Sequence, residues 1–177
     1  MRIIAGAWRG RPLLAPAGMA TRPTSDRARE ALFSMLQSRL GSFEGLEVAD
    51  LFAGTGALGL EALSRGAARC TFVEHDRQAV ETLRRNIDKL GARDRSEVRA
   101  IDATRMAGGP YHLVFLDPPY DSGLGRPAVE NLIAAGALAP GALVSIETAR
   151  TAEVALPGLA VEAERTYGKA KLTLLRA

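Results

Sequence analysis

The chain has 177 residues, of which 47% are hydrophobic and 24% charged, and this balance is typical of a globular domain and excludes a disordered or fibrous protein. It has no apolar run near the roughly 20 residues that a membrane helix needs and no continuous apolar stretch typical of a secretory signal. Its single cysteine, Cys70, cannot form an internal disulfide, and no Cys/His cluster indicates a metal site. We therefore expect a cytoplasmic protein without membrane or metal association.

Positive charge is concentrated at the N-terminus. Residues 1–30 contain six arginines and two acidic residues, a net charge of +4, whereas the remaining 147 residues sum to −1. The planar guanidinium of arginine suits contacts to phosphates and bases. The clustering favours a nucleic-acid-facing segment over a merely solvated one. The candidate RNA-binding residues are Arg2, Arg9, Arg11 and Arg22.

The order of apolar and amphipathic segments predicts an α/β fold. Residues 1–20 are expected to form a small basic hairpin extension, and residues 21–177 the larger domain. A helix capped by Ser25 and ended by Gly41 follows; its apolar stripe consists of Ala28, Ala31, Leu32, Met35, Leu36 and Leu40. Strands are expected at 46–52, 69–74, 98–101, 111–116 and 142–146, helices at 58–65, 76–90 and 127–135, and an antiparallel pair at 159–164 and 171–175. Such alternation indicates a mostly parallel sheet with helices on both faces.

A glycine-rich loop follows the first strand expected in the larger domain. Gly54, Gly56 and Gly59 give the pattern G-x-G-x-x-G between a strand and a helix, which allows a tight turn and the close approach of a ligand. About 20 residues further on, Glu74 ends the next strand, where such folds place a carboxylate on ribose hydroxyls. Both a nicotinamide or flavin dinucleotide and S-adenosylmethionine are compatible with this arrangement.

Several features favour S-adenosylmethionine. The carboxylate of Asp50 beside the loop would repel a pyrophosphate but suits the ammonium group of a methionine moiety; the alternative is that it braces the loop. Too little chain remains for the separate substrate domain that many dehydrogenases carry. Asp102, after the third strand, can accept a hydrogen bond from the adenine amine, although a solvated loop aspartate is an equally good interpretation.

The strand expected at 111–116 runs directly into Asp117-Pro118-Pro119-Tyr120. The exocyclic amine of a nucleobase is a poor nucleophile because its lone pair is delocalised into the ring. The Asp117 carboxylate and the Pro118 carbonyl can each accept one N–H, which turns the lone pair toward an incoming methyl group. Pro119 stiffens the turn, and the Tyr120 ring can stack on a flipped base. A strand-terminating turn is the alternative, but its place in a glycine-loop α/β domain favours amino-group methylation.

With these residues in view, the chain resembles the bacterial 16S ribosomal RNA guanine-N2 methyltransferases of the RsmD family over essentially its full length. The resemblance lies in RIIAGAWRGR at 2–11, RPTSDRAREALF at 22–33, the loop 50–59 with EALSRGA at 61–67, and the tetrapeptide 117–120. Many members have Phe where this chain has Tyr120, and either ring can stack.

The resemblance implies a class I, Rossmann-like methyltransferase with a mostly parallel seven-stranded sheet. It implies S-adenosylmethionine as the methyl donor and, as the acceptor, the N2 amine of a guanine in small-subunit RNA. We expect a monomer that acts on partly or fully assembled 30S particles. It also suggests that Thr24 and Asp26 lie over the methionine end of the cofactor. The candidate cofactor-binding residues are Thr24, Asp26, Asp50, Phe52, Gly54, Gly56, Glu74, His75, Asp102 and Ala103.

Other functions remain as alternatives at this stage. The same tetrapeptide can hold the amine of adenine, so a DNA or RNA adenine-N6 methyltransferase is one of them. A nicotinamide-dependent oxidoreductase and an RNA-binding ribosome-assembly factor with a silent methylase fold are two others. No motif identifies the residues that would select guanine.

Overall fold

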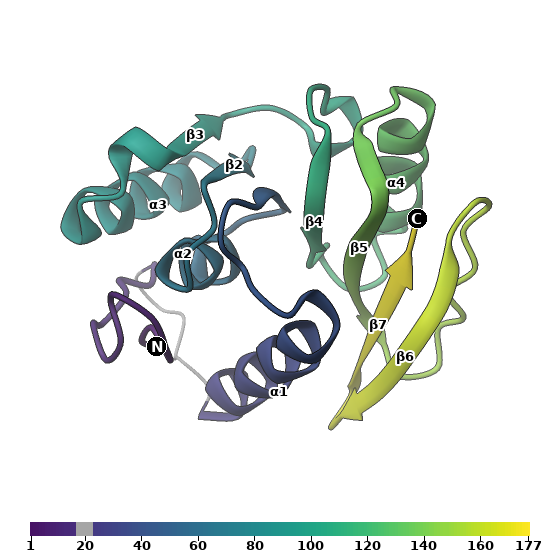
Figure 1. The fold of residues 1–177 in the computed structure, drawn as a ribbon, viewed down its shortest axis with the longest axis horizontal. Coiled ribbons are helices and arrows are strands. Elements are labelled where there is room, and N and C mark those ends of the chain that lie inside the picture. The colour runs from purple at the N-terminus through teal and green to yellow at the C-terminus, as the bar shows by residue number, and fades with distance from the viewer. Residues whose placement is uncertain (17–22) are drawn as a thin grey trace.

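The computed structural model describes residues 1–16 and 23–177; for residues 23–25 it describes the backbone only. The elements in chain order are α1 (Pro23–Leu40), β1 (Glu47–Leu51), α2 (Ala57–Ser64), β2 (Arg69–Val73), α3 (Arg77–Leu90), η1 (Arg93–Arg95), β3 (Ser96–Arg99), η2 (Ala103–Arg105), β4 (Tyr111–Leu116), α4 (Gly125–Ala134), β5 (Leu138–Ala149), β6 (Ala160–Tyr167) and β7 (Ala170–Arg176). They follow the predicted alternation of strands and helices (Figure 1).

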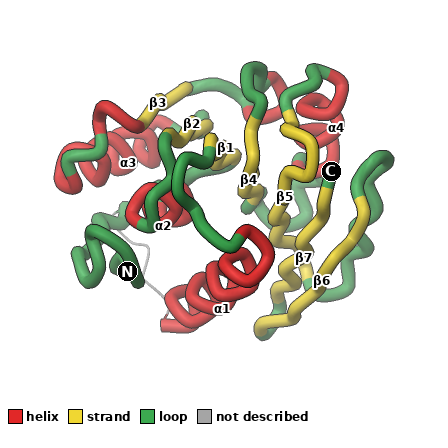
Figure 2. Tube along the Cα trace, in the orientation of Figure 1, coloured by secondary structure: helices red, strands yellow, loops and turns green. Residues whose placement is uncertain are grey.

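Seven strands of the described chain form one sheet in the order β3-β2-β1-β4-β5-β7-β6 (Figure 2). The first five strands in this order run parallel, and β7 is antiparallel to both β5 and β6. The predicted mostly parallel seven-stranded α/β sheet is therefore confirmed. Because the chain steps outward from β1 to β3 and then returns to place β4 on the other side of β1, β1 and β4 form a topological switch point, where open α/β sheets bind ligands.

Helices cover both faces of the sheet. Alternate residues of each central strand face opposite sides, as in the pair Val48 and Ala49, whose side chains belong to different core clusters. One cluster contains apolar residues of α1, α2 and α3, and the other contains those of α4. The sheet thus separates two cores and leaves its carboxyl edge to the connecting loops.

Two elements differ from the prediction. Helix α1 begins at Pro23, before the expected cap Ser25, and it buries Arg29, Leu32, Phe33 and Leu36. Its buried face is therefore shifted from the predicted stripe, because the Phe33 ring packs 5.6 Å from the ring of Phe115 in the sheet. Strand β5 is longer than the strand expected at 142–146, and a register shift opposite β4 accommodates the extra residues.

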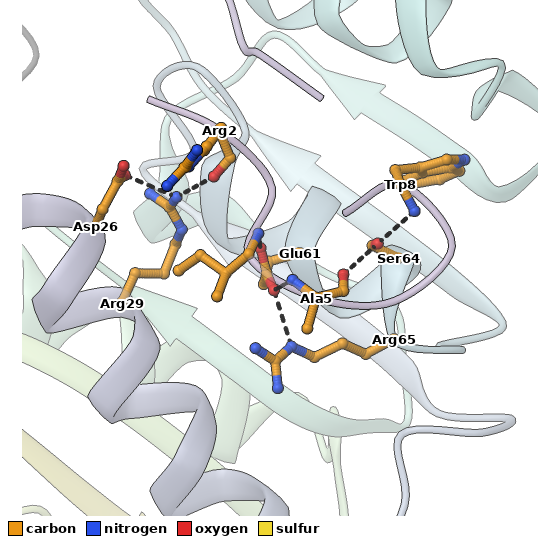
Figure 3. A network of polar contacts seen from close by, with 9 residues as sticks. Arg2, Ala5, Trp8, Asp26, Arg29, Glu61, Ser64 and Arg65 are labelled. Carbon is orange, nitrogen blue, oxygen red and sulfur yellow. Dashed lines mark hydrogen bonds and ion pairs between the residues drawn. The ribbon is translucent and has the colours of Figure 1, made fainter. Parts of the chain in front are cut away.

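The N-terminal segment, residues 1–16, folds back as a loop closed by an antiparallel bridge between Arg2 and Pro12. Figure 3 shows how it is fixed to α2: the fully buried carboxylate of Glu61 accepts hydrogen bonds from the backbone N–H of Ile4 (2.8 Å) and Ala5 (3.0 Å). Ile3 of the same segment is 1% exposed within the first core cluster. The segment therefore packs on the core of the larger domain, and its separation as residues 1–20 stays a prediction.

None of the helices in the described residues is both long and apolar enough to cross a membrane.

Candidate active site

The strand register brings the candidate site residues into one row. Leu51 of β1 pairs with Val73 of β2 and Leu116 of β4, and Leu116 pairs with Ile146 of β5. The residues that directly follow these pairs are Phe52, Glu74, Asp117 and Glu147. Their strands are parallel, so all four residues lie at the same carboxyl edge of the sheet, at the switch point described above.

The glycine loop leaves β1 through a strained residue. Phe52 has a φ of 62°, in the left-handed region that a bulky side chain rarely adopts, and such strain is concentrated at functional sites. The buried Asp50 carboxylate accepts a hydrogen bond from the Gly59 N–H at 2.9 Å. Asp50 thus braces the loop, the alternative weighed above, and its direct contact with a ligand stays a prediction.

Two glycines of the loop serve different purposes. Gly54 has a φ of 56° and open space on the side where a Cβ would project, so a ligand can lie close to its backbone. At Gly59 a Cβ would stand 2.4 Å from the Phe72 ring, so this glycine lets α2 pack against β2. Gly56 begins α2, also with a positive φ, of 83°.

Glu74 directly follows β2 and accepts hydrogen bonds from the backbone around it. Its Oε2 accepts the N–H of Gly54, and its Oε1 accepts those of His75 and Asp76, each at 2.9 Å. A carboxylate has about four acceptor sites, so capacity remains for a ribose hydroxyl. The His75 side chain is 67% exposed, with Nδ1 3.7 Å from Glu74.

Asp102 caps the short helix η2 after β3. Its Oδ1 accepts hydrogen bonds from the N–H and the hydroxyl of Thr104, both at 2.8 Å, and these bonds lower the pKa of Asp102. Oδ2 still faces the exposed surroundings of this residue and could accept from an adenine amine. The neighbouring Ala103 is buried.

The Asp-Pro-Pro-Tyr turn begins where β4 ends. Asp117, Pro119 and Tyr120 are exposed and Pro118 is half-buried. The Tyr120 hydroxyl donates a hydrogen bond to Oε1 of Glu147 at 2.7 Å, which ties the turn to the end of β5. Tyr120 as a residue is 54% exposed, which leaves its ring accessible for stacking.

Carboxylates at this edge influence one another. Burial raises the pKa of Asp50 well above its usual value, the Gly59 N–H lowers it in part, and the charges of Asp117 and Glu74 add to the rise. Although Asp117 touches solvent, desolvation of its carboxylate by the surrounding protein, together with the nearby Glu147 charge, raises its pKa to about 7. The pKa of Asp50 therefore depends on the charges of Asp117 and Glu74, and the pKa of Asp117 depends on the charge of Glu147.

A cavity of about 400 Å³ adjoins the turn on the β5 side. Its walls are mainly apolar, with Ile146, Val154 and Leu156 among them, and Glu147 and Tyr120 contribute polar atoms. Glu147 was not among the predicted site residues. The signal for it in the sequence is a charged residue placed directly after the apolar run at 142–146.

The edge fits a cationic nucleoside better than a dinucleotide. Glu74 and Asp117 bring carboxylates to the edge that holds the glycine loop, and negative charge there would repel a pyrophosphate but attract a sulfonium or an ammonium group. The open side of Gly54 gives room beside the loop. The donor and acceptor set therefore fits S-adenosylmethionine.

Several predicted residues lie outside this row. Arg22 and the side chain of Thr24 are outside the described part of the chain. Asp26 forms an ion pair with the buried Arg29 at 3.0 Å (Figure 3). The three described arginine candidates, Arg2, Arg9 and Arg11, are exposed, and the Arg11 guanidinium donates to the Lys89 carbonyl on α3. Among residues 1–16 and 23–177 no group of three or more His, Cys, Asp or Glu residues is arranged to hold a metal ion.

Comparison with known proteins gives consistent matches. The profile of the family described as conserved hypothetical protein 95 matches residues 1–176. The ribosomal RNA small subunit methyltransferase D of Escherichia coli K12 is 42% identical over 153 residues, which cover 84% of this chain and 74% of that protein. The protein of the same name from Haemophilus influenzae is 37% identical over 163 residues, covering 89% and 83%.

Solved structures share the fold. The candidate methyltransferase yhhF of Escherichia coli matches with a TM-score of 0.88 at 37% identity, covering 99% of this chain and 97% of that one. The magnesium protoporphyrin IX methyltransferase of Synechocystis PCC 6803, solved with bound S-adenosylmethionine, matches with a TM-score of 0.67 at 13% identity, covering 90% and 86%. The fold is that of the class I S-adenosylmethionine-dependent methyltransferases.

Proposed function

Because this chain belongs to the family described as conserved hypothetical protein 95, we propose that it methylates the exocyclic N2 amine of a guanine in small-subunit ribosomal RNA, with S-adenosylmethionine as the donor. The observation that carries the proposal is the strand register, which aligns the glycine loop, Glu74 and Asp117 at one edge of the sheet. A donor held by the loop and an amine held by the Asp-Pro-Pro turn would then be neighbours.

The cofactor would be held by the loop from Phe52 to Gly56, by Glu74 at the ribose and by Asp102 at the adenine. When bound, S-adenosylmethionine supplies a methyl carbon activated by the positive sulfonium. Glu74 fixes the loop in advance because its carboxylate already binds the Gly54 N–H, so little reorganisation is needed on binding.

At the acceptor side, Asp117 and the Pro118 carbonyl would each accept one hydrogen of the amine. Holding both hydrogens points the nitrogen lone pair toward the glycine loop, and the exposed face of Tyr120 would stack on the base. The amine becomes acidic as it gains the methyl group, and Asp117 then takes the proton that it loses. A pKa of about 7 suits Asp117 for this task near neutral pH.

The nucleic acid would be reached through the N-terminal segment. Arg2 and Arg9 are exposed on a segment that Glu61 fixes to α2, so their charges are presented from a rigid support. We expect partly or fully assembled 30S particles to be better substrates than naked RNA, because the basic segment is small. This function would be carried out by a monomer in the cytoplasm.

The test is the methylated nucleoside itself. Small-subunit particles from a strain that lacks this protein would be incubated with the enzyme and labelled S-adenosylmethionine, digested and analysed by mass spectrometry. N2-methylguanosine is the expected product. N6-methyladenosine would replace the proposal by the adenine alternative, and cofactor binding without any methyl transfer would favour an assembly factor.

A further inference from the structure

The carboxylate of Glu147 has no role in the function proposed above, although it lies in the row of site residues. It follows Ile146, which pairs with Leu116, so it stands in β5 beside Asp117, the first residue after β4. Glu147 is half-buried and lines the cavity of about 400 Å³. A charged residue in that position has lost part of its hydration, which is costly unless a partner compensates.

The described part of the chain supplies few hydrogen-bond or ion-pair partners to the Glu147 carboxylate. The Tyr120 hydroxyl donates to Oε1 at 2.7 Å. Among the described residues, no arginine, lysine or histidine forms an ion pair with Glu147. Since a carboxylate has about four acceptor sites, Oε2 and part of Oε1 remain for a ligand in the cavity.

Two adjacent carboxylates call for a ligand edge that carries adjacent donors. Asp117 and Glu147 repel each other, and this repulsion contributes to the raised pKa of Asp117. A group that presents two N–H donors side by side would satisfy both acceptors and relieve the repulsion.

Among the common bases that carry an exocyclic amine, guanine has such an edge. Its N1–H lies next to its N2 amine, so both groups donate. In adenine and cytosine the ring nitrogen beside the amine carries no hydrogen and is an acceptor, which would meet the Glu147 carboxylate with repulsion. The choice between a guanine and an adenine acceptor can therefore be made by one residue next to Asp117.

We propose that Glu147 is the residue that selects guanine, by accepting the N1–H of the base while Asp117 and Pro118 hold its N2 amine; this inference rests on the proposed function. Tyr120 orients the Glu147 carboxylate through its hydroxyl, in addition to offering its ring for stacking. The cavity beyond Glu147 is of the size that small ligands occupy, about 300–1,000 Å³, and its mainly apolar wall suits a purine face.

Base analogues test this proposal with the unaltered enzyme. Small subunits would be reconstituted with RNA whose target nucleotide, located by the product analysis above, is guanine, 6-thioguanine or 2,6-diaminopurine. The first two carry N1–H, whereas diaminopurine keeps the 2-amine and has an acceptor at N1. We expect kcat/KM for 6-thioguanine within about fivefold of guanine, and for diaminopurine at least about 100-fold lower, because a site built for a donor rejects an acceptor strongly.

Substitutions then assign the effect to Glu147. In Glu147→Gln the charged acceptor for the N1–H of guanine is lost, so we expect kcat/KM for guanine to fall about 10- to 100-fold. The new amide can donate to N1 of diaminopurine, so the preference for guanine over diaminopurine should drop below about tenfold. Tyr120→Phe, which keeps the ring, should weaken the preference by less. Glu44→Gln removes one exposed carboxylate before β1, at the opposite edge of the sheet, and should leave the preference unchanged.

The outcomes separate the two proposals. A wild-type enzyme that uses diaminopurine as well as guanine overturns the selection proposal without any variant, as does an undiminished preference in a folded Glu147→Gln protein that binds cofactor normally. In both cases N2-methylguanosine would still be formed, so the proposed function would stand. If the product is not N2-methylguanosine, the proposed function itself fails. A merely structural role of Glu147 would lower activity on both bases alike.

Discussion

The two halves of the site treat their carboxylates in opposite ways. On the cofactor side, Asp50 accepts a backbone N–H from Gly59, and Glu74 accepts three such bonds, from Gly54 and from the two residues that follow Glu74. On the acceptor side, Glu147 receives one tyrosine hydroxyl, and desolvation and the Glu147 charge act on Asp117 without an opposing hydrogen bond from the described residues. Among the described residues, the chain supplies four backbone hydrogen bonds to the carboxylates of the first half and one side-chain hydrogen bond to those of the second.

This difference indicates what each half does. Carboxylates that bind backbone N–H groups hold a loop in one shape, which is suited to presenting a cofactor in a fixed position. Carboxylates left with unused acceptors can bind hydrogens of a substrate and receive a proton from it. Substitutions on the cofactor side should therefore change binding of the donor, and those on the acceptor side should change the rate and the choice of base.

The largest effect is expected at Asp117. Asp117→Asn keeps one acceptor oxygen but removes the proton acceptor, so we expect kcat to fall about 10²- to 10³-fold. Affinity for S-adenosylmethionine should stay within about twofold, because the glycine loop is untouched. Single-turnover methyl transfer and calorimetry measure the two quantities. Near-normal turnover in this variant would contradict the proposed mechanism.

At Glu74 the opposite pattern is expected. Glu74→Gln has a single acceptor oxygen for three backbone N–H groups, so the Gly54 loop should loosen and the Kd for S-adenosylmethionine should rise about tenfold. With saturating cofactor, kcat should remain within about threefold of the unaltered enzyme. Glu81→Gln on α3 is the matched control, since that carboxylate is 63% exposed in a surface ion pair. A fall in kcat without a change in the Kd for S-adenosylmethionine would contradict the separate roles of the cofactor side and the acceptor side.

A smaller effect is expected in the pH dependence. Asp117 must be ionised to receive the proton and its pKa is about 7, so kcat/KM should rise with pH around a midpoint near 7 and should reach about a tenth of its plateau at pH 6. Glu147→Gln removes the charge that helps to raise this pKa, so the midpoint should move to lower pH. Rates measured from pH 5.5 to 9 would show the shift. A midpoint that moves upward, or a flat profile, would contradict the role of Asp117.

The sequence signals for the cofactor half are local, whereas part of the acceptor half depends on contacts between distant segments. Gly54, Gly56 and Glu74 occur at fixed spacings because a backbone turn and the next strand end determine their places. Glu147 is 30 residues beyond Asp117 in the chain and meets it through the pairing of β4 with β5, which local patterns do not contain. The sequence likewise does not distinguish Arg29 from the other N-terminal arginines, yet Arg29 is buried and donates to the Arg2 carbonyl of the folded-back N-terminal segment.

The smallest effect is expected for the stability of the cofactor half, at Asp50. Its pKa in the folded protein is raised above the value of about 3.9 in an unfolded chain, so its contribution to stability is greatest below about pH 4 and declines as the pH rises through the folded-state pKa. In Asp50→Asn the amide oxygen can still accept the Gly59 N–H without a buried charge. The variant should therefore gain about 1 kcal/mol over the unaltered protein at pH 8, or about 2–4 °C in Tm, and less at pH 5. Thermal unfolding of both proteins at the two pH values isolates this one group, because all others are shared. An advantage that shrinks toward pH 8 would mean that the folded protein prefers the charged form of this carboxylate, which would contradict the raised pKa of Asp50.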